Sequence, residues 1–283
     1  MTFQPTPFRN VTFLLRKFNA RPYSSSASSV NPTEVSHFDK LASSWWDPHG
    51  SSRLLHQMNP LRHQFISSCL TKHATQSGDS HASKLSFLDI GCGGGIFAES
   101  AARLHRTEKV IGIDPSNEVV SVAQEHARQD PLLYEKGRLE YRNLSMESMP
   151  LPQRSDDKFD IVTLFEVIEH ISQPAPFLDS CLPFVKPGGW LILSTIARTW
   201  TSWLTTKFVA EDVVRMVPQG THDWNKYINE HELMKFFGNK IGWGKDRGLR
   251  SQGCLYIPGL GWKFVDGGEQ WGNYFFGIRK NQE

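Results

Sequence analysis

Long hydrophobic runs and paired cysteines are both missing from this sequence of 283 residues. Its apolar stretches, such as Trp190 to Leu193, are far shorter than the roughly 18 residues that a membrane-spanning helix requires. The four cysteines are scattered and form no CxxC pair, so neither a disulfide framework nor a structural zinc site is indicated. We therefore expect a soluble or peripheral protein in a reducing compartment.

A large excess of one sign of charge is also missing, because the chain has 31 Lys and Arg residues and 29 Asp and Glu residues, for a net charge of +2. The first 30 residues contain no acidic residue, but they hold four of the basic ones: Arg9, Arg16, Lys17 and Arg21. The remaining 27 basic and 29 acidic residues give 31–283 a net charge of −2. This balance argues against a nucleic acid as substrate or partner.

The acid-free segment 1–30 has the composition of an organellar transit peptide. Its apolar residues share one side of a predicted helix: Val11, Leu14, Leu15 and Phe18. Polar residues interrupt them too often for the core of a secretory signal. We expect a mitochondrial transit peptide over 1–30, cleaved near Arg21, and one folded domain over 31–283. A disordered N-terminal tail is the alternative.

Apolar segments alternate with helical patterns after residue 84, which favours a parallel sheet covered by helices on both faces. The expected strands are residues 85–90, 110–113, 139–144, 159–165, 190–195, 262–265 and 273–279. The expected helical segments are residues 32–46, 61–70, 96–104 and 118–127. The predicted fold class is α/β, with a doubly wound sheet.

The strongest motif is Leu88 to Gly95 (LDIGCGGG), where an apolar strand runs into a glycine loop that opens a helix. Such a loop lets a ligand lie against bare backbone at a helix N-terminus. A dinucleotide-binding GxGxxG loop starting at Gly91 would need glycine at position 96, which is Ile96. Asp114 ends the next strand, where a carboxylate can accept both hydroxyls of a ribose. The combination suits an adenosine-type cofactor and weakens the dinucleotide interpretation.

Together with Gly112 to Asp114 (GID) and Lys186 to Gly189 (KPGG), this loop resembles the class I S-adenosylmethionine-dependent methyltransferases. Further segments are similar to the ubiquinone biosynthesis O-methyltransferase family: Ser43 to Asp47 (SSWWD), Asn59 to Arg62 (NPLR), Phe165 to His170 (FEVIEH) and Arg215 to Trp224 (RMVPQGTHDW). The resemblance spans about 32–279. It implies a Rossmann-like sheet of seven strands with the last strand antiparallel, preceded by N-terminal helices and carrying an insertion after the fifth strand.

The resemblance implies contacts with S-adenosylmethionine at four residues: Arg62, Gly91, Asp114 and Phe165. Arg62 would pair with the methionine carboxylate through a charge-assisted contact, and Gly91 would let the backbone approach the cofactor closely. Met146 and Glu147 are candidates for flanking the adenine, although many surface loops have this composition. The alternative roles are an ordinary surface arginine for Arg62 and a core side chain for Phe165.

Chemistry is expected at Glu166, Glu169 and His170, because positions i, i+3 and i+4 of a helical turn share a face. In one interpretation they hold a divalent ion, Mg²⁺ or alternatively Zn²⁺, that binds a catechol and acidifies the attacking phenol. In another, His170 is the general base and the two acids orient it. A third interpretation makes the cluster structural.

The family's substrates are polyprenylated phenols and quinols. The resemblance therefore implies O-methylation of 3,4-dihydroxy-5-polyprenylbenzoate and of demethylubiquinol, peripheral contact with the matrix side of the mitochondrial inner membrane, and membership of a multi-enzyme complex. Within the insertion over 198–237, Trp200, Leu204 and Phe208 form an apolar stripe, which we interpret as a lid that contacts the membrane and admits the isoprenoid tail. Packing of the stripe over the active site is the alternative, and the segment Thr221 to Trp224 is either part of the substrate pocket or a structural turn.

Other classes of function are compatible with parts of this sequence. A nicotinamide-dependent oxidoreductase is disfavoured by Ile96. A methyltransferase of amino groups would typically have Asn-Pro-Pro-Tyr after the fourth strand, where this chain has Phe165 to His170. An O-methyltransferase of another catechol-like molecule and an inactive scaffold share the fold, which by itself proves no activity.

Overall fold

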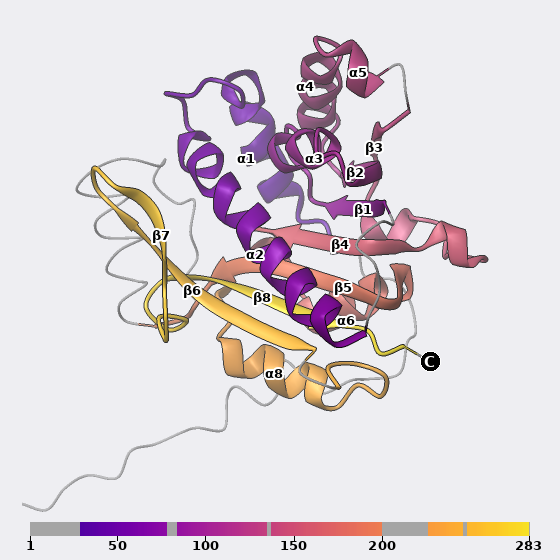
Figure 1. Cartoon of the computed structure of the whole chain (residues 1–283). Coiled ribbons are helices and arrows are strands. Elements are labelled where there is room, and N and C mark those ends of the chain that lie inside the picture. The colour runs from indigo at the N-terminus through magenta and orange to yellow at the C-terminus, as the bar shows by residue number, and fades with distance from the viewer. Residues whose placement is uncertain (1–28, 78–83, 135–136, 200–225, 246–247, 283) are drawn as a thin grey trace, which may run out of the picture.

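The computed structural model describes residues 29–77, 84–134, 137–199, 226–245 and 248–282 (Figure 1). Two predictions fall largely outside these residues: the transit peptide over 1–30, and the stripe and loop of the insertion over 198–237. Among the described residues, no helix is both long enough and apolar enough to cross a membrane.

The described strands form one mixed sheet of eight strands in the order β3-β2-β1-β4-β5-β8-β6-β7. Their bounds are β1 Leu85–Ile90, β2 Thr107–Asp114, β3 Leu139–Asn143, β4 Phe159–Phe165, β5 Val185–Ile196, β6 Leu249–Ile257, β7 Gly261–Val265 and β8 Asn273–Arg279. Neighbours from β3 to β5 are parallel, whereas β5, β8, β6 and β7 pair antiparallel. The predicted α/β fold with an antiparallel last strand is confirmed.

The antiparallel edge of the sheet differs from the expected seven strands. The strand β6 was not predicted; it pairs with β8 on one side and with β7 on the other, so that β6 and β7 form a hairpin. The strand β7 is the edge strand and β6 is its inner neighbour, and most side chains of both strands are only half-buried. A half-buried antiparallel strand does not need the continuous apolar run that marks a buried parallel strand, which is why the sequence pattern missed β6.

The described helices are α1 Pro32–Leu41, α2 Arg53–Ser77, α3 Ile96–Ala102, α4 Asn117–Ala127, α5 Pro131–Tyr134, α6 Pro174–Cys181 and α8 Glu230–Gly238. The helix α1 begins after Asn31, whose side chain accepts a hydrogen bond from the Thr33 N–H, and Pro32 occupies its first turn. The helix α2 begins well before the predicted start at residue 61 and contains Pro60. The helix α6 was not predicted.

The core lies on both faces of the sheet. On β8, Phe275 belongs to a cluster with Phe65 of α2, whereas Phe276 belongs to a cluster with Phe237 of α8. This follows from the alternation of side chains along a strand. The helices α2, α3 and α4 therefore cover one face, and α6 and α8 cover the other (Figure 1). A third cluster packs the segment of α1 and the 3₁₀ turn Ala42–Ser44 against α3 and α4.

Candidate active site

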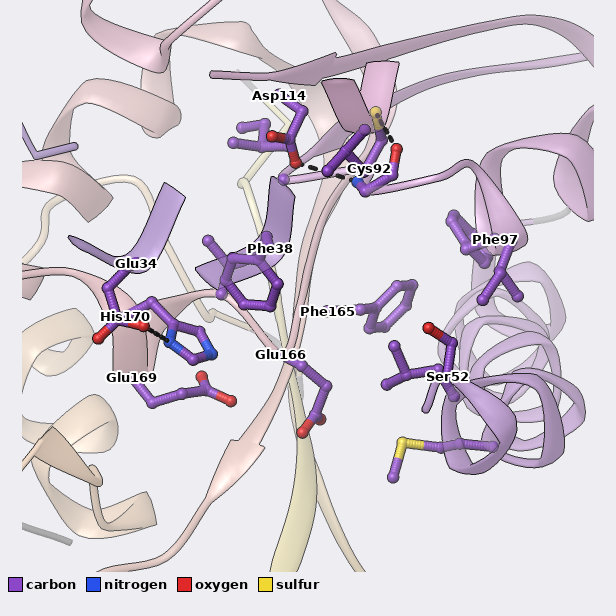
Figure 2. Close-up of a pocket in the computed structure, with 18 of the residues that line it drawn as sticks. Glu34, Phe38, Ser52, Cys92, Phe97, Asp114, Phe165, Glu166, Glu169 and His170 are labelled. Carbon is purple, nitrogen blue, oxygen red and sulfur yellow. Dashed lines mark hydrogen bonds and ion pairs between the residues drawn. The ribbon is translucent and has the colours of Figure 1, made fainter. Parts of the chain in front are cut away.

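A cavity of about 750 Å³ opens at the carboxyl ends of β1, β2 and β4, the edge where open α/β sheets bind ligands. It is lined by all seven residues for which the sequence predicted a cofactor contact or chemistry at the cluster 166–170: Arg62, Gly91, Asp114, Phe165, Glu166, Glu169 and His170. Figure 2 shows Asp114 on one side of the pocket and Glu169 and His170 on the other. Met146 also lines the cavity, whereas Glu147 instead accepts a hydrogen bond from the Ser29 N–H at 3.0 Å.

The glycine loop after β1 follows a left-handed backbone that side chains from other elements approach closely. Gly91 has φ +70°, and a Cβ there would lie 2.5 Å from the Val167 side chain. Gly93 has φ +52°, and a Cβ there would lie 2.4 Å from the Trp45 indole. Both positions therefore need glycine for conformation and for space. The close neighbour of Gly91 is Val167, so its role includes protein packing as well as the predicted approach to a ligand.

Asp114, the last residue of β2, is held by two backbone donors. Its Oδ2 accepts from the Gly93 N–H at 3.0 Å, and its Oδ1 accepts from the Ser116 N–H at 2.9 Å. Burial raises the pKa of Asp114 to about 6, although these two hydrogen bonds act to lower it. The glycine loop and the carboxylate thus form one unit, with the remaining lone pairs of the carboxylate available to ribose hydroxyls.

Arg62 of α2 is a buried cation that lines the cavity. Only 4% of its surface is exposed, its guanidinium lies 4.9 Å from the centre of the Phe165 ring, and its Nε is buried without a hydrogen-bond partner in the described structure. Burial lowers the pKa of Arg62, while the charges of Glu166 and Asp89 raise it. A buried guanidinium with an unsatisfied donor fits an incoming carboxylate, as the methionine part of S-adenosylmethionine would supply. Arg62 is therefore not an ordinary surface arginine.

Asp89 is a site residue that the sequence reasoning missed. It lies on β1, lines the cavity, and accepts a hydrogen bond from the Thr163 hydroxyl at 2.7 Å. Burial raises its pKa to about 7, against the lowering effects of Thr163 and Arg62. A carboxylate in the middle of the apolar strand 85–90 was the signal that could have identified it.

Glu166 and Glu169 leave the end of β4 and take different hydrogen-bond partners. Glu166 has φ +57°, a left-handed conformation that is costly for a residue with a Cβ and that clusters at functional sites. Its carboxylate accepts from the Ser194 hydroxyl at 2.6 Å and from the Asn273 amide at 3.2 Å. Glu169 is buried and accepts from the Thr195 hydroxyl at 2.9 Å. Burial and the neighbouring Glu166 raise the pKa of Glu169 to about 7.

The predicted metal ligands do not form a ready metal site. The turn at Ile168–His170 is a short 3₁₀ helix, so the expected α-helical face of Glu166, Glu169 and His170 is not formed. In the described part of the chain, no group of three or more His, Cys, Asp or Glu side chains is arranged to hold a metal ion. Because each of the three side chains is bound to a different partner, the donor set as placed does not fit a shared ion, and we derive no step through one.

His170 is instead paired with Glu34, a residue that the sequence reasoning missed. The His170 Nδ1 lies 3.0 Å from Glu34 Oε2, and Lys226 Nζ lies 2.7 Å from Glu34 Oε1. His170 holds the pKa of Glu34 down to about 2 despite its burial, with help from Lys226. Burial lowers the pKa of His170, but Glu34, Glu169 and Glu166 together outweigh it and raise that pKa. Figure 2 shows the dashed contact from Glu34 on one side of the imidazole and the pocket on the other.

Sequence comparisons find relatives over most of the chain. A family model described as "Methyltransferase domain" matches residues 88–193. A "Ubiquinone biosynthesis O-methyltransferase, mitochondrial" from Candida albicans is 38% identical, covering 89% of this chain and 86% of the relative. A protein of the same name from Schizosaccharomyces pombe is 46% identical, covering 74% and 71%. A bacterial "Ubiquinone biosynthesis O-methyltransferase" from Leptothrix cholodnii is 37% identical, covering 81% and 89%.

Solved structures agree on the fold. The plantazolicin methyltransferase BpumL in complex with SAH has a TM-score of 0.54 at 16% identity, covering 88% of this chain and 97% of that one. The magnesium protoporphyrin IX methyltransferase (ChlM) from Synechocystis PCC 6803 with bound SAM has a TM-score of 0.53 at 14% identity, covering 90% and 100%. At these identities the likeness establishes the architecture alone.

Proposed function

The chain belongs to the ubiquinone biosynthesis O-methyltransferase family, and from this we propose that it methylates a phenolic hydroxyl of a prenylated substrate, with S-adenosylmethionine as the methyl donor. One observation carries the proposal. A single cavity joins a cofactor end, made by the glycine loop, Asp114 and Arg62, to an imidazole at His170 whose Nδ1 is already bound to Glu34.

The cofactor end supplies three contacts of different chemistry. The guanidinium of Arg62 binds the methionine carboxylate, Asp114 accepts the ribose hydroxyls, and Gly91 to Gly93 lie alongside as bare backbone. Phe165 keeps Arg62 in place by lying under its guanidinium. When bound, S-adenosylmethionine supplies an electrophilic methyl group, and the electron pair of the broken C–S bond stays on sulfur as the phenolate oxygen bonds to the methyl carbon.

His170 acts as the general base for the phenol. Donation from Nδ1–H to Glu34 leaves the lone pair on Nε2, which takes the phenolic proton as the oxygen becomes a nucleophile. The carboxylate of Glu34 stabilises the imidazolium that forms. The apolar walls of the cavity exclude water, and the residues that hold donor and acceptor in line lower the entropic part of the barrier.

The identity of the two substrates is part of the proposal. We assign 3,4-dihydroxy-5-polyprenylbenzoate and demethylubiquinol, since each has a hydroxyl ortho to a second oxygen. Glu166 lines the cavity near His170 and is placed to accept a hydrogen bond from that second oxygen. Another catechol-like molecule and an inactive scaffold are the competing functions.

The test is transfer of a labelled methyl group from S-adenosylmethionine to 3,4-dihydroxybenzoate and to its 5-prenylated form. The expected result is a product methylated on oxygen, and its loss in His170→Ala by about 100-fold or more. No methylation of either compound would reject the proposed function. The divalent ion at Glu166, Glu169 and His170 stays a prediction that the same assay decides: activity abolished by a chelator and restored by Mg²⁺ would support it, and activity that survives complete chelation would reject it.

We place the mature enzyme in the mitochondrion, on the matrix side of the inner membrane, in peripheral contact with the bilayer and within a multi-enzyme complex. Support comes from the acid-free segment 1–30 and from the word "mitochondrial" in the names of the fungal relatives. A substrate with an isoprenoid tail is confined to the bilayer, which favours an enzyme that works at its surface.

A further inference from the structure

We propose that the first turn of α2 and the β6–β7 hairpin form a binding groove for the isoprenoid tail of the substrate, continuous with the active-site cavity. This inference rests on the proposed function, because it takes the substrate to be prenylated. It assigns a role to the hairpin that the sequence pattern did not predict, and it needs no residue of the insertion over 200–225.

The groove has two apolar walls that contact each other. Leu54 lines the cavity from α2, and the hairpin contributes Leu255, Tyr256, Pro258 and Trp262. The Trp262 indole N–H donates to the backbone oxygen of Leu54 at 3.0 Å, which fixes the hairpin against the helix. Tyr256 and Trp262 meet edge to face with their ring centres 5.6 Å apart. These two contacts therefore fix Leu54, Tyr256 and Trp262 relative to one another.

The inner end of the groove lies next to Glu166 of the proposed active site. The Asn273 amide donates to Glu166, and Asn273 follows Gly272, where a Cβ would lie only 3.0 Å from a methyl of Leu255. A ring whose hydroxyl faces His170 would thus direct a substituent past Glu166 toward Leu255. From there the hairpin continues to Pro258 and Gly259, which line the cavity and are exposed, so the groove reaches the surface at the tip. The three residue steps from Leu255 to Pro258 span about 10 Å along the groove.

The proposed ribose contact, Asp114, lies far from the hairpin across the sheet. Asp114 ends β2, and the strands β1, β4, β5 and β8 lie between β2 and β6 in the sheet. Five strand spacings of about 4.8 Å separate the two by roughly 24 Å. The hairpin contributes mainly hydrocarbon to the lining, whereas β1 and β2 contribute the carboxylates of Asp89 and Asp114. A hydrocarbon tail is the ligand part whose chemistry matches the hairpin end.

The test compares the binding of two probes to the protein saturated with S-adenosylhomocysteine, by titration calorimetry without lipid. The probes are 3,4-dihydroxybenzoate and the same compound carrying a geranyl group at carbon 5. We expect the geranyl compound to bind at least about tenfold more tightly, because its added carbons leave water. Equal dissociation constants for the two probes would overturn the groove.

Substitutions in the two walls of the groove test whether these walls cause the tighter binding of the geranyl probe. Leu255→Asn on the hairpin and Leu54→Asn on α2 should each weaken binding of the geranyl probe about tenfold and leave the unprenylated probe within about threefold. Ile257→Asn is the matched control, since Ile257 lies on the same strand, is 39% exposed and does not line the cavity. Equal losses in Leu255→Asn and Ile257→Asn, or equal losses for both probes, would overturn the groove. Selective binding without methyl transfer would reject the proposed function and leave the groove intact.

Discussion

Glu34 fixes the imidazole of His170 in one orientation and one tautomer, so its substitution tests the general-base mechanism directly. We expect Glu34→Gln to lower kcat about 100-fold, because a neutral amide cannot stabilise the imidazolium and can donate to Nδ1, which would move the proton to Nε2. The KM for S-adenosylmethionine should stay within about twofold, since no cofactor contact changes.

The control for Glu34 is Lys226→Met, which removes the second partner of the carboxylate and leaves its contact with His170. Its kcat should fall less than about threefold, as expected for a partly exposed ion pair. Steady-state kinetics of the unsubstituted protein, Glu34→Gln and Lys226→Met measure kcat and the cofactor KM for this comparison. Equal losses in Glu34→Gln and Lys226→Met, or a rise in the cofactor KM that accounts for the loss, would point to a structural role for Glu34.

Asp114 gives cofactor binding a pH dependence whose sign follows from its raised pKa. Burial raises that pKa to about 6, so the carboxylate is ionised above this pH and gains a proton as the pH falls through it. The protonated form has lost one acceptor for ribose hydroxyls. We expect the dissociation constant of S-adenosylhomocysteine to rise about tenfold between pH 7.5 and pH 5, because the ionised fraction falls tenfold per unit below the pKa.

The comparison protein for this titration is Asp114→Asn, whose affinity should be weaker at pH 7.5 and should change clearly less between pH 7.5 and pH 5, where Asp89 still titrates. Calorimetry on both proteins at both pH values separates the contribution of Asp114 from that of Asp89, whose carboxylate remains in the variant but loses the raising effect of the Asp114 charge on its pKa. Parallel pH profiles in the two proteins would show that another group causes the dependence.

The elements at the centre of the sheet were predicted well from the sequence, because strands buried on both faces need continuous apolar runs. The strands β1, β4 and β8 match the expected bounds. The strand β6 and the helix α6 were missed, because β6 has no continuous apolar run and α6 has only eight residues. In the site, the cluster at 166–170 and Asp114 were found through local motifs. Glu34 was not, since it is separated from His170 by 136 positions and only the fold brings the two together.

The segment that joins α1 to α2 helps to position the glycine loop. The Trp46 indole N–H donates to the Gly94 oxygen at 2.8 Å, and its ring stacks on His126 with centres 3.4 Å apart. This contact holds the glycine loop from the N-terminal side. We expect Trp46→Phe to lower the free energy of unfolding by about 1 kcal/mol, the usual net worth of one hydrogen bond, and to weaken cofactor binding several-fold.

Denaturant unfolding and calorimetry measure the two effects of Trp46→Phe. Trp271→Phe is the matched control, because Trp271 is 52% exposed and does not line the cavity. It should leave both quantities unchanged within about 0.5 kcal/mol. Unchanged cofactor affinity in Trp46→Phe would mean that the glycine loop keeps its shape without the indole.

The whole chain divides into two parts with different charge, and this difference predicts which part directs import into mitochondria. Residues 1–30 carry four basic and no acidic residues, while 31–283 have a net charge of −2. We expect 1–30 fused to a fluorescent protein to send it into mitochondria, because an amphipathic basic segment is what import recognises. A fusion of 31–283 should remain outside.

The matched control replaces Arg9, Arg16, Lys17 and Arg21 by Gln, which keeps the apolar face and removes the charge. Microscopy should place this variant in the cytosol, and a reporter with 1–30 that stays in the cytosol would contradict the assignment. Cleavage near Arg21 would remove most or all of these four basic side chains from the mature enzyme. Its contact with a prenylated substrate would then depend on apolar side chains such as Leu54 and Leu255, and not on a general attraction to anionic lipids.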